Sequence, residues 1–101
     1  YRNECRLDLN DGKPPVYPDF TILHPKTKKL IYWEHFGMMD TPDYCDEACR
    51  KINRYLKAGF LPGKNLFFSF ETSTVPFDSK AAECIIDAIL QANSPLPCEI
   101  S

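Results

Sequence analysis

Two strand-like runs of this chain each carry one carboxylate among apolar and aromatic residues. The first run is Tyr17-Pro18-Asp19-Phe20-Thr21-Ile22, and the second is Ile31-Tyr32-Trp33-Glu34-His35-Phe36-Gly37. An acidic side chain in such a run is costly to bury unless something compensates its charge. The chain must therefore fold so that each acid meets a partner, and two acids on neighbouring strands make a candidate site for a divalent metal ion.

The pattern of apolar residues predicts one small α/β domain over residues 1–101, with its elements in the order β-β-β-α-β-α. We expect strands over residues 1–9, 16–23, 30–36 and 66–71, helices over 42–58 and 79–92, and a tail over 93–101. Short polar turns separate the first three strands, so these should form an antiparallel meander. A helix separates the last two strands, which favours a parallel pair. The expected fold is a small mixed sheet packed against helices.

Composition narrows the class of protein. The chain has 101 residues, enough for one domain, and its formal net charge is −2. No overall basic field therefore points to nucleic acid, and local charges must carry any such interaction. No apolar run approaches the roughly 18 residues of a membrane span, so we expect no membrane association. The chain begins at Tyr1 without a methionine, and we interpret it as a domain excised from a longer protein.

The cysteines are odd in number and lack the spacing of a zinc site. There are five, at Cys5, Cys45, Cys49, Cys84 and Cys98. We interpret them as buried thiols in a reducing compartment, which predicts a cytoplasmic protein. The alternative is a redox or metal pair formed by Cys45 and Cys49, which lie four residues apart on a predicted helix.

The two carboxylates should approach each other. A hairpin around the polar turn at 24–29 places Asp19 near Glu34, with Cβ atoms roughly 5–8 Å apart. Carboxylates this close repel each other unless a cation or a proton intervenes. Mg²⁺ favours one or two carboxylates together with water and phosphate oxygens. The alternative is structural: Asp19 caps a turn beside Pro18, and Glu34 pairs with a nearby lysine or arginine.

These motifs resemble those of a nuclease superfamily. Pro18-Asp19-Phe20, followed on the next strand by Glu34-His35-Phe36-Gly37 and then by a helix, is similar to the PD-(D/E)XK superfamily, in a branch with a WEH-hydrophobic-Gly motif. By the order of its elements the resemblance covers residues 1–72. It implies a restriction-endonuclease-like core that binds Mg²⁺ or Mn²⁺ through Asp19, Glu34 and the backbone carbonyl of His35, with both acids catalytic.

The sequence departs from the superfamily pattern at two places. Phe36 occupies the position of the superfamily's lysine. Some members use a polar residue and a tyrosine on the following helix, and Lys51 and Tyr55 match that spacing, so Lys51 could supply the missing ammonium. The alternatives are His35 as the base, or Lys51 as a solvated lysine and Tyr55 as a core-edge aromatic. The superfamily's N-terminal helix has no room before the first strand, so we expect the domain to lack it.

A basic stripe on the first predicted helix completes the candidate site. Arg50, Arg54 and Lys57 recur at helical spacing and could contact a phosphate backbone. The alternative is a solvated face paired with the nearby acids of the same helix. These observations predict a metal-dependent nuclease domain acting on nucleic acid, which we expect to be DNA. The alternatives are a catalytically inactive nuclease-fold module that binds DNA or protein, and an α/β interaction domain without a role in nucleic acid.

Overall fold

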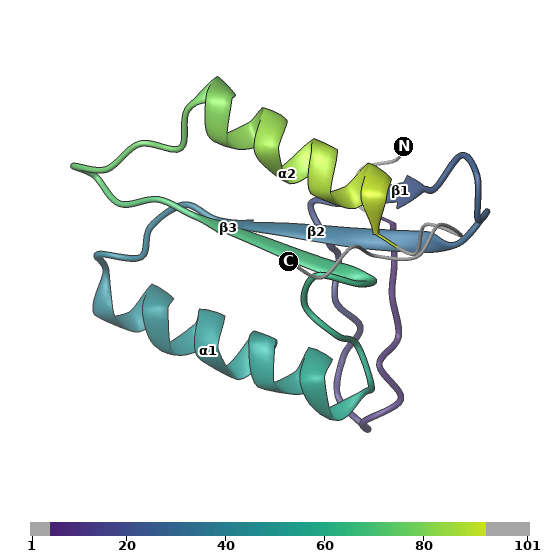
Figure 1. The fold of residues 1–101 in the computed structure, drawn as a ribbon. Coiled ribbons are helices and arrows are strands. Elements are labelled where there is room, and N and C mark those ends of the chain that lie inside the picture. The colour runs from purple at the N-terminus through teal and green to yellow at the C-terminus, as the bar shows by residue number, and fades with distance from the viewer. Residues whose placement is uncertain (1–4, 93–101) are drawn as a thin grey trace.

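The protein is a small α/β domain with two helices and a mixed sheet, and the computed structural model describes residues 5–92 (Figure 1). The elements are β1 Phe20–Leu23, β2 Leu30–Phe36, α1 Pro42–Lys57, β3 Leu66–Phe70 and α2 Ser79–Gln91. Within the described residues the sheet has three strands in the order β1-β2-β3. The central strand β2 pairs antiparallel with β1 and parallel with β3, which confirms the predicted mixed sheet and crossover.

The predicted strand over residues 1–9 is wrong for its described part. Residues 5–9 form no strand, and their only strand-type backbone pairing is an isolated antiparallel bridge between Leu7 and Val16. Residues 1–4 lie outside the described residues, as does the predicted tail at 93–101. The described order is therefore β-β-α-β-α. The turn that follows residue 9 has left-handed backbone at Asn10 (φ 56°) and Gly12 (φ 77°), which directs the chain away from an extended ladder.

The first strand of the hairpin is also shorter than predicted, because β1 begins at Phe20 rather than at residue 16. Extension of the register Phe20–Trp33 places Pro18 opposite His35. Proline has no N–H and cannot donate to the ladder. The N–H of His35 instead donates to Oδ2 of Asp19 at 2.7 Å. A side chain thus takes the place of backbone pairing at this end of the sheet.

The other predicted elements are confirmed to within one residue at their ends. Pro42 occupies the first turn of α1, where its missing N–H costs nothing, and Gly59 follows the helix with a φ of 97°. Asp78 caps α2 by accepting from the N–H of Ala81 at 2.8 Å. Among the described residues, neither helix has both the length and the apolar character needed to cross a membrane.

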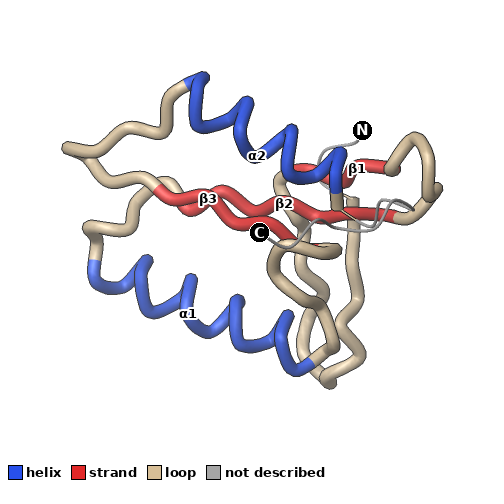
Figure 2. The backbone as a smooth tube through the Cα atoms, in the orientation of Figure 1, coloured by secondary structure: helices blue, strands red, loops and turns tan. Residues whose placement is uncertain are grey.

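The two helices lie on opposite faces of the sheet, so the domain has three layers (Figure 2). Strand alternation divides the core accordingly. One cluster of buried residues includes Tyr55 of α1 with Leu66 of β3, and the other includes Ile89 of α2 with Trp33 of β2. Because Glu34 follows Trp33 in β2, its side chain points to the α1 face.

The cysteines that the structure describes are thiols, and the prediction that they are buried is wrong. Cys5 and Cys45 are half-buried, while Cys49 and Cys84 are exposed. Cys49 of α1 and Cys84 of α2 occupy exposed positions of their helices, so burial does not follow from residue type. Cys98 lies outside the described residues.

Candidate functional site

The candidate site centres on Glu34, which lies near the end of the central strand under α1. Glu34 is only 2% exposed. Its Oε2 atom accepts a hydrogen bond of 2.7 Å from the hydroxyl of Tyr55 and forms an ion pair of 3.3 Å with Nζ of Lys51. Lys51 and Tyr55 lie one turn apart on α1, so both reach the same carboxylate. The helix pair that the sequence singled out therefore meets the second acid of the motif.

Burial dominates the electrostatics of this cluster. It raises the pKa of Glu34 above its ordinary value, while the Tyr55 hydrogen bond and the Lys51 charge oppose that rise and the Asp19 carboxylate adds to it. Burial, followed by the charge of Glu34, also raises the pKa of Tyr55. The tyrosine therefore stays a hydrogen-bond donor at neutral pH. The influence of Asp19 on both groups places the two acids of the motif within one electrostatic environment.

Asp19 immediately precedes β1 and is exposed at the edge of the sheet. Continuing the register Phe20–Trp33 by one pair brings Asp19 opposite Glu34. Oδ2 of Asp19 accepts from the N–H of His35, so this carboxylate binds a strand and does not cap a turn beside Pro18. The structural alternative for Glu34 was pairing with a nearby lysine or arginine, and Lys51 forms such an ion pair.

The backbone of His35 faces the same edge as Asp19. In a strand, the N–H and C=O of one residue point toward the same neighbouring strand. The His35 N–H points toward Asp19, so its carbonyl faces that side too, where Pro18 has no N–H to donate. Oxygen atoms from two carboxylates and a carbonyl are the donors that Mg²⁺ or Mn²⁺ takes. Among the side chains of the described residues, no set of three or more His, Cys, Asp or Glu converges as a metal site, so a carbonyl ligand is essential to this proposed set.

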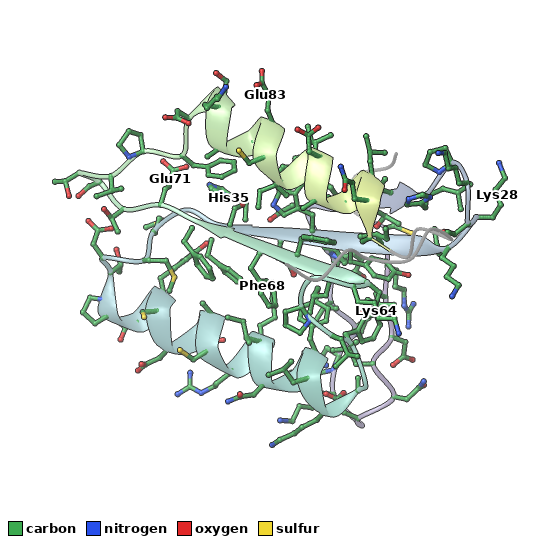
Figure 3. All side chains as sticks on the ribbon, viewed as in Figure 1. Lys28, His35, Lys64, Phe68, Glu71 and Glu83 are labelled. Atoms are coloured by element: carbon green, nitrogen blue, oxygen red, sulfur yellow. The ribbon has the colours of Figure 1, made fainter. Side chains whose placement is uncertain are left out.

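The side chain of His35 lies on the opposite face of the sheet from Glu34. Its ring contacts Oγ of Ser69 through Nδ1 and Oε1 of Glu71 through Nε2, each at 2.7 Å. Figure 3 shows His35 and Glu71 on the α2 side of the sheet, whereas Phe68 points toward α1. This orientation is the one that strand alternation predicts, and it separates the His35 ring from Glu34.

Phe36, at the superfamily's lysine position, belongs to the apolar core. It is 4% exposed, and its ring packs against Phe68 and Phe70 at centroid distances of 5.7 and 5.6 Å. An ammonium at position 36 would have to displace this aromatic contact. The cation that reaches the candidate site in this chain is instead Lys51, from α1.

The basic stripe on α1 is largely engaged with acids. Arg54 donates to both carboxylate oxygens of Asp11, at 2.7 and 3.0 Å, and to the carbonyl of Pro14 at 2.8 Å. Arg50 pairs with Glu47 at 2.6 Å, and Lys57 is exposed in the last turn. Arg54 thus fastens the 10–15 turn to the helix, a role that helical spacing did not indicate.

A cavity of about 420 Å³ opens beside this cluster on the α1 side. Four cations line it, Lys13, Arg50, Lys51 and Arg54, together with the aromatic rings of Phe36 and Tyr44. Sequence reasoning missed Lys13, because only the folding of its turn against α1 brings it to this cavity. The turn signal around Gly12 was visible, but the surface against which the turn packs was not.

The fold and this cluster define a small α/β domain with a buried acid held by a lysine and a tyrosine from one helix. Comparison of the chain with known protein families, with curated proteins and with solved structures found no match.

Proposed function

We propose that this chain is a metal-dependent nuclease domain with a restriction-endonuclease-like core. It hydrolyses phosphodiester bonds of nucleic acid, and its expected substrate is DNA. The observation that carries the proposal is that Lys51 and Tyr55 share one oxygen of the buried Glu34. The sequence motif by itself singles out these residues. Their meeting at one carboxylate, with Asp19 next to it, supports the assignment of Asp19, Glu34, Lys51 and Tyr55 as catalytic.

The stability of the fold does not call for this cluster. A buried ion pair rarely stabilises a protein more than well-packed apolar residues of similar volume. A carboxylate whose pKa is perturbed by burial and by specific charges is characteristic of functional sites. Glu34 has both features, which favours a chemical role over a structural one.

Asp19, Glu34 and the carbonyl of His35 are the groups that would hold Mg²⁺ or Mn²⁺. A bound metal ion supplies a Lewis acid for the phosphate and makes a water molecule more acidic. Tyr55 fixes the orientation of Glu34 by its hydrogen bond. Lys51, whose side chain is 37% exposed, can reach solvent beside the buried acid. There its ammonium would orient the attacking water and offset charge that develops on the phosphate.

The cations of the α1 cavity would bind the phosphate backbone on either side of the cleaved bond. Arg50 is exposed, and its pair with Glu47 is a surface pair that costs little to exchange for a phosphate. Lys57 extends the same face of the helix. Arg54 would contribute mainly by holding the 10–15 turn, and with it Lys13, at the cavity.

The test is the loss of cleavage when either acid is neutralised. We expect Asp19→Asn and Glu34→Gln to abolish Mn²⁺-dependent cleavage of labelled DNA while circular dichroism shows a folded protein. Glu83→Gln, an exposed acid on α2 on the opposite face of the sheet, is the matched control and should retain cleavage. Undiminished cleavage by either purified acid variant would refute the proposal.

The second candidate is a catalytically inactive module that keeps the nuclease fold and binds DNA or protein. The packing of Phe36 into the aromatic core favours it. Calorimetric titration with Mn²⁺ separates the two: heat of binding that disappears in Asp19→Asn supports the nuclease, whereas no binding at millimolar metal supports the module. DNA binding that weakens as salt rises would distinguish such a module from a protein-binding domain. We place either protein in the cytoplasm, consistent with free thiols at the described cysteines.

A further inference from the structure

A second cavity, of about 650 Å³, opens on the α2 side of the sheet. Its lining is mainly aromatic and includes Tyr17, Phe20, Trp33, His35 and Phe77, with Asp19 also lining it. We call this the aromatic pocket. Its volume is typical of sites for small organic groups. Asp19 and His35 belong both to the aromatic pocket and to the proposed metal-binding set, Asp19 through its carboxylate and His35 through its ring and its backbone carbonyl. The two sites therefore meet at the edge of the sheet.

The rings of the aromatic pocket are tilted against one another and remain partly open. Phe20 and Trp33 lie 5.0 Å apart between centroids with an interplanar angle of 40°, and His35 and Phe77 lie 4.9 Å apart at 42°. Tyr17 is 52% exposed. Trp33 is only 7% exposed, so the π-faces on which another planar group can stack are those of the half-buried His35 and Phe77 and of the exposed Tyr17.

The polar atoms of the Trp33 and His35 rings already have partners inside the protein. Nε1 of Trp33 donates to Oγ of Ser69 at 2.8 Å. Nδ1 of His35 is hydrogen-bonded to Ser69, and Nε2 of His35 is hydrogen-bonded to Glu71. The pocket therefore offers stacking surfaces but few hydrogen-bond groups that could read a ligand's edge. A guest held in this way is recognised as a flat ring, with little dependence on its substituents.

We propose that the aromatic pocket receives an unpaired nucleobase from the strand that is cleaved. This inference rests on the proposed nuclease function and adds the substrate class: single-stranded nucleic acid, or a duplex with an unpaired nucleotide. A phosphate at Asp19 lies at the mouth of the pocket, so the adjoining base can enter it. A base held in a duplex stack cannot present both of its faces to protein rings, whereas an unpaired base can.

The cations of the α1 cavity, on the other face of the sheet, favour a nucleobase over an apolar protein side chain as the occupant. The cations Lys13, Arg50 and Lys51 line the α1 cavity, on the other side of the same sheet edge. A polyanionic strand that crosses this edge would place phosphates among these cations and one base among the rings. An apolar peptide would leave the cations without a role.

Binding to strands with and without bases tests the proposal. Trp33 is the only tryptophan of the chain, so its fluorescence reports on stacking in the pocket. In EDTA, which prevents metal-dependent cleavage, we expect a single-stranded oligothymidylate to bind about fivefold or more tightly than an abasic strand of the same length, as one stacked base requires. We also expect it to quench Trp33.

Variants of Phe77 locate the effect. Phe77→Leu keeps an apolar side chain but removes a stacking face, and it should abolish most of the preference for the base-bearing strand. Val75→Ala, in the same loop and 63% exposed, is the matched control and should keep it. Thermal unfolding checks that both variants fold. Equal affinity for both strands without quenching of Trp33, in the wild-type protein, would overturn the proposal.

A parallel cleavage assay with Mn²⁺ separates this inference from the proposed function. Base-dependent binding without cleavage keeps the aromatic pocket and rejects the nuclease. Cleavage at equal rates on normal and abasic strands keeps the nuclease and rejects the pocket. Faster cleavage of single strands than of the matching duplex supports both.

Discussion

The hydroxyl of Tyr55 donates a 2.7 Å hydrogen bond to Oε2 of Glu34, and both residues are buried. This contact joins helix α1 to the central strand across the α1 face of the sheet. It also affects the titration of the acid, because it opposes the rise in the pKa of Glu34 that burial causes. A single hydroxyl therefore links the packing of the helix to the chemistry of the candidate site.

Removing that hydroxyl should weaken the fold. We expect Tyr55→Phe to lower the free energy of unfolding by about 1–3 kcal/mol, because Glu34 then loses a buried hydrogen-bond donor. Urea denaturation measures the change. Tyr17→Phe is the control, since Tyr17 is 52% exposed, and it should leave the midpoint nearly unchanged. Equal midpoints for both variants would show that the contact contributes nothing to stability.

The raised pKa of Glu34 predicts how stability changes with pH. Above the ordinary value of 4.5 and up to the raised value, the folded protein binds more protons at Glu34 than the unfolded chain does. The contribution of Glu34 to stability should therefore fall as pH rises through that window. We expect melting temperatures of Glu34→Gln to lack this decline when they are compared with the wild type from pH 4 upward. Parallel curves for the two proteins would contradict it.

The ion pair between Asp11 and Arg54 predicts the opposite trend in acid. The Arg54 guanidinium lowers the pKa of Asp11 to about 2 from its ordinary value of 3.8. The ion pair therefore contributes stability that is fully present above pH 3.8 and is lost as the pH falls toward 2. In Asp11→Asn this loss should be absent, and the turn that carries Lys13 should be easier to cleave with protease. Asp46→Asn, another exposed acid, should behave like the wild type in both measurements.

Lys51 provides the sharpest test of how this chain manages without a lysine at position 36. We expect Lys51→Met to reduce cleavage by a factor on the order of 100, the usual loss when one stabilising group is removed from a reacting centre. Lys51→Arg should retain part of the activity because it keeps the positive charge. Because Lys51→Met also removes the ionic partner of the buried Glu34, thermal unfolding checks that the variant is folded under the assay conditions.

A surface lysine far from the α1 cavity serves as the control for that experiment. Lys80 is exposed in the first turn of α2, on the opposite face of the sheet. Lys80→Met should cleave at the wild-type rate. If Lys51→Met also did so, the ammonium of Lys51 would have no part in the reaction, and its ion pair with Glu34 would be structural.

Local pattern was enough to predict most of the fold. The apolar run at 30–36 predicts a central strand, and the apolar stripe that includes Ala48 and Tyr55 predicts α1. Both predictions work because residues on one face of a helix or a strand recur at a fixed spacing in the sequence. The predicted strand over 1–9 is wrong for residues 5–9, its described part, because alternation at Leu7 and Leu9 indicates a strand only where a partner lies alongside. Here the chain turns away after one bridge to Val16.

The amino-acid sequence by itself determined which residues could share a face. Strand and helix repeats separate Glu34 from the His35 ring and place Lys51 and Tyr55 one turn apart. Only the tertiary structure decided which partners they meet. Lys51 and Tyr55 contact Glu34, and Arg54 contacts Asp11. Asp19 lines the aromatic pocket. Periodicity describes the residues within one helical turn or one strand. These contacts depend instead on how α1, α2 and the 10–15 turn pack on the sheet, and that packing is determined by burial of the whole core.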